Sequence, residues 1–144
     1  MRKRQTKKPK FFFFDVGVKR AFDGTLQIQI LPGSSTYGQA FEHFFILECI
    51  RMNDYLEKDF RFSYLRTKDD LEVDLIIERP GQKTLLVEIK SGTVDDVEAD
   101  KLIAISKDFG KSAEVLFACG ENHARKKTHA EILPWMSALE KIFA

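Results

Sequence analysis

The chain has 144 residues, of which 44% are hydrophobic and 31% are charged, which excludes a disordered chain and suits one domain with a hydrophobic core. No apolar run approaches the ~20 residues of a membrane helix, so we expect no membrane contact. The two cysteines lack a zinc-binding spacing and suit a reducing compartment, so we expect a cytoplasmic protein.

The first ten residues form a basic arm. Six of the 23 Lys and Arg residues lie in it, without any acid, so the rest of the chain is net acidic although the whole carries +1. Such an arm either binds nucleic acid phosphates or is simply a solvated end, and the sequence leaves both readings open. Its cations are Arg2, Lys3, Arg4, Lys7, Lys8 and Lys10.

Residues 11–35 begin the domain that we expect to span 11–144. The four phenylalanines at 11–14 predict a short buried strand, and residues 16–22 fit a short helix. Glycine and proline then predict a loop over 23–35. Within that loop an edge strand is possible, with alternating Leu26, Ile28 and Ile30.

Residues 36–58 carry the strongest helical pattern in the chain, with a wide apolar stripe at spacings of three and four. Glu48 falls on the predicted stripe and Glu42 on its flank. A carboxylate there needs a cationic partner or a metal ion, or it stays protonated. Both an ion pair and a metal ligand remain open for each. The stripe includes Tyr37, Phe41, Phe44, Met52 and Tyr55, and it is widened by Phe45, Ile46, Cys49 and Leu56.

Residues 60–66 alternate as a strand, and Lys68–Asp70 is predicted to turn into a β-hairpin. Its strands are 71–77 and 85–91, joined by a loop with Pro80–Gly81. Paired residue numbers sum to 161, or to 162 with a one-residue bulge. Alternation predicts that one face of the first strand carries Val73, Leu75 and Ile77.

The opposite face of the hairpin is predicted to bring together Asp74, Glu88 and Lys90 in either register. Two carboxylates suit Mg²⁺, which keeps most of its waters, and a lysine can orient a water for attack on a phosphate. The alternative is a set of solvent-facing side chains in which Asp74 and Lys90 form a weak cross-strand pair.

The remaining elements complete an alternating pattern. Residues 94–109 predict a helix with Val97 among its core residues, and 113–119 predict a buried strand lying parallel to 85–90. Residues 121–129 read as a charged loop, either an ordinary surface or a phosphate contact. A strand at 131–135 leads into a last helix, whose inward residues are expected to be Trp135, Leu139, Ile142 and Phe143.

A P-loop is missing. Gly110–Lys111–Ser112 imitates the end of that motif, but Ile105 stands where its first glycine should be, and a strand follows. We therefore expect no P-loop ATPase activity from this chain.

The motif of Asp74 followed by Glu88-Ile89-Lys90 resembles that of the PD-(D/E)XK nucleases, with Val73 in place of proline. Nearly the whole chain resembles the C-terminal domain of bacterial and archaeal AAA-type ATPases known as domain of unknown function 4143. The matching segments are 10–17, 38–42, 72–74 and 87–91. The resemblance implies an α/β, restriction-endonuclease-like core with a central mixed sheet of four to five strands flanked by helices.

This resemblance also implies a function. Asp74, Glu88 and a helix glutamate would hold Mg²⁺ or Mn²⁺, with Glu42 the first choice and Glu48 the reserve, and Lys90 would position the attacking water. The expected substrate is DNA. An ATPase domain or a second copy of the chain is an expected partner. The alternative is a non-catalytic nucleic-acid-binding or protein-interaction module of an ATPase.

Overall fold

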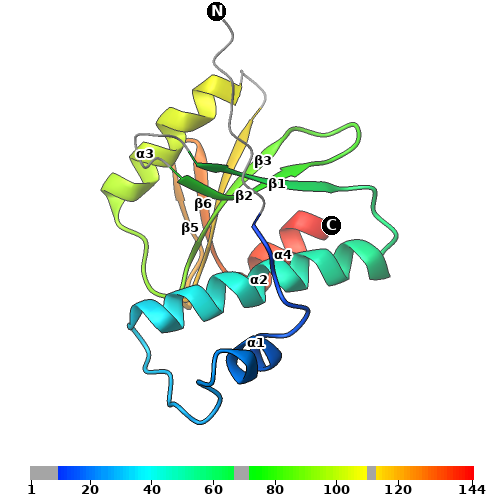
Figure 1. The fold of residues 1–144 in the computed structure, drawn as a ribbon. Coiled ribbons are helices and arrows are strands. Elements are labelled where there is room, and N and C mark those ends of the chain that lie inside the picture. Colours follow the sequence, from blue (N-terminus) through cyan, green and yellow to red (C-terminus); the bar gives the residue numbers. More distant parts are fainter. Residues whose placement is uncertain (1–9, 67–71, 110–112) are drawn as a thin grey trace, which may run out of the picture.

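The computed structural model describes residues 10–66, 72–109 and 113–144 (Figure 1). The basic arm up to residue 9, the turn predicted at Lys68–Asp70 and the Gly110–Ser112 motif lie outside these residues. None of the helices in the described parts is long and apolar enough to cross a membrane.

A six-stranded mixed sheet forms the centre of the molecule, in the order β1-β2-β3-β4-β6-β5. The pairs β1/β2, β2/β3 and β5/β6 are antiparallel, whereas β3, β4 and β6 run parallel. The α/β class is confirmed, and the sheet is larger than expected because part of the predicted loop 121–129 forms an edge strand. The strands are β1 (Arg61–Arg66), β2 (Glu72–Glu78), β3 (Leu85–Lys90), β4 (Glu114–Cys119), β5 (Arg125–Lys127) and β6 (Ala130–Pro134).

Helices cover both faces of this sheet and enclose two hydrophobic cores. On one face α2 and α4 pack over β3, β4 and β6, and on the other α3 packs over β3 and β4 (Figure 1). The central strand β4 is buried nearly throughout, as its continuous apolar run predicts. The helices are α1 (Val16–Phe22), α2 (Ser35–Tyr55), α3 (Asp96–Ser106) and α4 (Trp135–Phe143), with a 3-10 turn at Lys107–Phe109.

The hairpin adopts the register whose paired numbers sum to 162, as Leu75↔Val87 and Ile76↔Leu86 show. Between β1 and β2 the register shifts, so that Asp74 and Leu75 together lie opposite Tyr64. This is a β-bulge, which re-aims the side chains on one strand. The prediction that Val73 shares a face with Leu75 was therefore wrong: Val73 lies in the α3 core and Leu75 in the α2/α4 core.

Most of the apolar stripe predicted on α2 is confirmed. Phe45, Ile46 and Cys49 lie in the α2/α4 core, and Phe41 and Met52 pack against it. At the end of the helix the stripe fails, because Tyr55 is 82% exposed.

The N-terminal segment forms no strand, contrary to prediction. It crosses α2 toward α1 (Figure 1), with Phe13 O 2.7 Å from His43 Nε2 and Phe14 O accepting a hydrogen bond from Arg51 Nη2. Phe12 packs against the α2/α4 core while Phe11 is 87% exposed.

Two further predictions about apolar side chains failed. The edge strand at residues 26–30 is absent, and Ile28 is exposed. Val97 is exposed on α3, because the helix instead buries Ala99, Leu102 and Ile105.

Candidate active site

The bulge in β2 turns Asp74 toward the partner strand β3. Asp74 Oδ2 accepts a hydrogen bond from the backbone N–H of Ile89 at 2.8 Å. The ladder between these strands ends at Leu75↔Val87, so the carboxylate satisfies an N–H that lies beyond the last backbone pair. Asp74 is thereby fixed beside Glu88, the residue next to its hydrogen-bond donor.

Glu88 and Lys90 lie on the α3 side of β3. Lys90 Nζ lies 3.2 Å from Glu88 Oε1 and 3.1 Å from Glu98 Oε1, a residue in the first turn of α3. The Glu88 side chain is 18% exposed and the Lys90 side chain 31% exposed. The three residues predicted from the hairpin are therefore gathered at the end of β3, with Glu98 as an additional member.

The two carboxylates are electrostatically unfavourable neighbours. Burial, and then the charge of Glu88, raises the pKa of Asp74 to about 7, although the Ile89 N–H favours the ionised form. Burial also raises the pKa of Glu88, and the neighbouring Lys90 only partly compensates. We name Asp74, Glu88 and Lys90 the hairpin site. It holds more negative charge than its own lysine neutralises.

Glu42 reaches the neighbourhood of the hairpin site from α2. It contributes to the raised pKa of Asp74. Its Oε1 also lies 3.2 Å from Lys10 Nζ, which lies 2.8 Å from Glu72 Oε1 and 4.9 Å from the centre of the Tyr64 ring. Burial lowers the pKa of Lys10, but these two carboxylates outweigh it, so the net shift is upward. Lys10 is thus a member of this region and not only a residue of the basic arm.

Glu48, the reserve candidate, is not brought to the hairpin site. Its Oε1 lies 2.5 Å from Arg51 Nη1, one turn along α2. This is the ion pair that the sequence left open for a carboxylate on α2.

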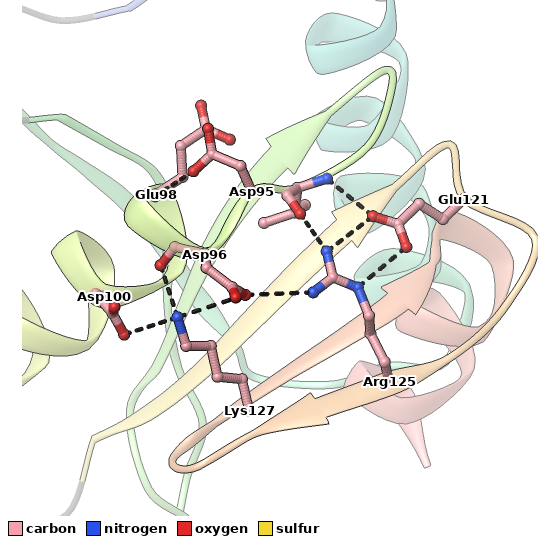
Figure 2. Close-up of polar contacts among 8 residues, drawn as sticks. Asp95, Asp96, Glu98, Asp100, Glu121, Arg125 and Lys127 are labelled. Carbon is pink, nitrogen blue, oxygen red and sulfur yellow. Dashed lines mark hydrogen bonds and ion pairs between the residues drawn. The ribbon is translucent and has the colours of Figure 1, made fainter.

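A second charged group holds the segment that follows β3 (Figure 2). Glu121 Oε1 accepts a hydrogen bond from Val94 N at 2.8 Å, and Arg125 donates to both Glu121 oxygens at 3.1 and 3.2 Å and to Val94 O. Asp96 lies 3.8 Å from Arg125 and 3.5 Å from Lys127. We name Glu121, Arg125, Asp96 and Lys127 the clamp.

Gly120 completes the attachment of this segment. Its N–H donates to Lys90 O and Gly92 O, and a Cβ atom there would lie 2.4 Å from Ser91 O. The clamp and Gly120 therefore fix the backbone between Lys90 and α3, and α3 carries Glu98.

Sequence reasoning missed three members of this region: Lys10, Glu72 and Glu98. Lys10 was named as a cation of the arm and Glu72 fell within the matching segment 72–74, but neither was assigned to the site. Glu98 had one signal: it lies in the first turn of the helix that begins a short connection after β3, and such a helix starts near the end of that strand.

The donor set fits a hard divalent cation as a two-carboxylate site. Within residues 10–66, 72–109 and 113–144, no three or more His, Cys, Asp or Glu side chains are arranged to hold a metal ion. Asp74 and Glu88 remain, and Mg²⁺ typically binds through one or two carboxylates and keeps several waters. A cation there would stabilise the ionised forms of Asp74 and Glu88, which burial first and neighbouring carboxylates second make unfavourable, raising both pKa values.

The fold and the site together define an α/β protein with a carboxylate pair and a lysine on a bulged hairpin beside its parallel strands. The family model described as Domain of unknown function (DUF4143) matches residues 37–138, and the chain belongs to this family. The match confirms the family expected from the sequence. Comparisons with curated proteins and with solved structures gave no match.

Proposed function

We propose that this chain is a magnesium-dependent, PD-(D/E)XK-like nuclease domain that acts on DNA phosphodiesters and is related to the C-terminal domain of AAA-type ATPases. The observation that carries the proposal is the pairing of Asp74 with Glu88, two half-buried carboxylates whose pKa values are both raised. Buried charges are ordinarily paired, and strongly perturbed groups are enriched at functional sites.

Each residue of the hairpin site has a distinct role in this proposal. Asp74 and Glu88 hold the cation, with Asp74 oriented by the Ile89 N–H. Glu42 supports this pair from α2. A bound Mg²⁺ or Mn²⁺ supplies charge neutralisation at the phosphate. Lys90 positions the attacking water, and Glu98 holds the Lys90 ammonium next to Glu88.

The test is cleavage of a panel of single-stranded, duplex and branched DNA with Mg²⁺ or Mn²⁺. Asp74→Asn and Lys90→Met are compared with the wild type and with Glu131→Gln. The control changes Glu131, a carboxylate on β6 that pairs with Lys141 and lies away from the hairpin site. We expect metal-dependent cleavage that falls by roughly a hundredfold or more in the first two variants and is retained in the control.

Two results would contradict the proposal. Cleavage that survives both site variants would place the activity elsewhere or in a contaminant. An absence of cleavage on every substrate, together with an unchanged melting temperature in millimolar Mg²⁺, would leave the hairpin site as a structural cluster.

The second candidate is a non-catalytic interaction module of an ATPase. The specific observation in its favour is the apolar surface of the N-terminal segment, since Phe11, Phe14, Phe22 and Ile28 are all more than half exposed. Large exposed apolar patches mark protein interaction sites or ligand-binding grooves. Binding of an ATPase domain that is lost when Phe11 and Phe14 are changed to serine, in a protein without nuclease activity, would favour this candidate.

A further inference from the structure

Lys10 lies between acidic residues of two separate elements. Its ammonium is 3.2 Å from the carboxylate of Glu42 on α2 and 2.8 Å from that of Glu72 on β2. The ring of Tyr64 on β1 lies on another side at 4.9 Å. Lys10 therefore contacts three elements at one point, and two of its three neighbours are anionic.

This point borders the hairpin site. Glu72 is two residues before Asp74 on β2, and the charges of both Glu42 and Lys10 act on Asp74. Lys90 on the other side is already engaged by Glu88 and Glu98. Lys10 supplies a positive charge that acts on Asp74 from the side of Glu42.

A structural role alone accounts for part of this arrangement. The N-terminal segment is attached to α2 through His43 and Arg51, which hold the backbone at Phe13 and Phe14. These contacts fix the chain within four residues of Lys10 and need no charge at position 10. The N-terminal segment is therefore attached without the Lys10 ammonium, which can act as a counter-ion.

From this geometry we propose that Lys10 is the resident cation of the carboxylates around Asp74, and that a divalent cation and the Lys10 ammonium compete for them. The inference rests on the proposed function and adds a regulation of the same site. Glu42 is paired with Lys10 in the metal-free protein and becomes available to the hairpin site when a divalent cation displaces the ammonium. Whatever moves the N-terminal segment, including a partner that binds its exposed phenylalanines, then changes the affinity for the metal.

The physical reason for competition is that both cations draw on the carboxylate of Glu42, which pairs with Lys10 and supports the proposed metal site. An ammonium is a single charge on a flexible stem, and it leaves a carboxylate more readily than a fixed guanidinium does. A dication at Asp74 and Glu88 repels a nearby ammonium and attracts Glu42 away from it. Removing the ammonium must therefore raise the apparent affinity for the metal, by thermodynamic linkage.

The experiment is a thermal melt of the purified chain in chelator and across a Mg²⁺ titration. Lys10→Met removes the charge and keeps the length of the stem, and Lys10→Arg keeps the charge. The matched control is Lys19→Met, which removes a lysine on α1 that pairs with Asp23. We expect Lys10→Met to melt lower in chelator and to need a Mg²⁺ concentration on the order of tenfold lower for half of its stabilisation. Lys19→Met should keep the wild-type midpoint, and Lys10→Arg should keep or raise it, because a guanidinium leaves a carboxylate less readily than an ammonium does.

An unchanged or higher Mg²⁺ midpoint in Lys10→Met would overturn the competition, because a purely structural lysine leaves the midpoint in place. If neither protein responds to Mg²⁺, both the metal site of the proposed function and the competition are refuted. A double-mutant cycle of Lys10→Met with Glu42→Gln, measured in chelator, then tests whether Lys10 is the counter-ion of Glu42 in the metal-free protein. Coupling between the two supports Lys10 as the resident counter-ion, and additive effects refute it.

Discussion

The hairpin site and the clamp contain the same kinds of side chains in opposite electrostatic states. In the clamp, Arg125 and the Val94 N–H stabilise the ionised form of Glu121 and lower its pKa (Figure 2). In the hairpin site, burial and a second carboxylate raise the pKa of Asp74. The clamp is a satisfied network that fixes the backbone. The hairpin site retains an unbalanced charge, which is what a cation-binding site requires before its ion arrives.

The largest expected effect is at the attachment beside the clamp. Gly120→Ala places a Cβ atom 2.4 Å from Ser91 O, which is backbone and cannot move aside easily. We expect a loss of about 3 kcal/mol in the free energy of unfolding, measured by urea denaturation. Gly92→Ala is the control, because a Cβ there meets nothing within 4 Å. Equal losses in both variants would show that the close approach of Gly120 to Ser91 does not cause the loss in the free energy of unfolding.

Asp74→Asn should stabilise the metal-free protein. The folded pKa of about 7 lies above the ordinary 3.8, so the folded state binds the extra proton between these values. Stability of the wild type must then fall as pH rises from about 4 to about 7 and level off above it. The amide still accepts from Ile89 N and carries no charge, so in chelator at pH 8 we expect a gain of about 2 kcal/mol. A destabilised variant would contradict the raised pKa.

Glu121→Gln should change the free energy of unfolding in the opposite direction, as a loss of stability. The pKa of Glu121 is lowered in the folded state, so its contribution is complete above the ordinary pKa of a glutamate and is lost as pH falls through the folded value. At pH 7 we expect the variant to lose about 1 kcal/mol, since one acceptor and the charge are removed. The difference between wild type and variant should shrink in melts below pH 4. A constant difference would show that the charge of Glu121 contributes nothing.

The smallest effect is expected at Glu98→Gln. This change removes one of the two carboxylates that hold Lys90, and the Glu98 side chain is 36% exposed. Partly exposed ion pairs contribute little, so we expect a loss of about 0.5 kcal/mol in urea denaturation. Any nuclease activity should fall by more than this stability change suggests, because Lys90 would no longer be held in place. Activity at the wild-type level would remove Glu98 from the site.

Much of the fold followed from local patterns. The hairpin, the strand at Arg61–Arg66, the long helix α2 and the parallel pairing of β3 with β4 are all confirmed. Periodicity and turn residues encode these elements directly. The strand predicted from the phenylalanine run was wrong. Four consecutive apolar residues do not indicate which of them will be buried, and of these four only Phe12 packs against a core.

The contacts that cover the other faces of α2 and the bulge at Asp74 could not be read from the sequence. Apolar residues surround α2 on several sides, because the sheet covers one face and the N-terminal segment another. A bulge depends on how β1 and β3 both pair with β2, and no single strand shows this.

The sequence by itself determined the elements of the core and the residue types of the hairpin site, because strand alternation places Glu88 and Lys90 together whatever surrounds them. Only the tertiary structure decided which other charges meet them. Lys10 comes from a segment far from β3 in the chain, and Glu98 comes from a helix whose first turn the clamp contacts through Asp96. Electrostatic interactions act through space, so the net charge of the hairpin site is a property of the packed molecule and not of the strand that carries it.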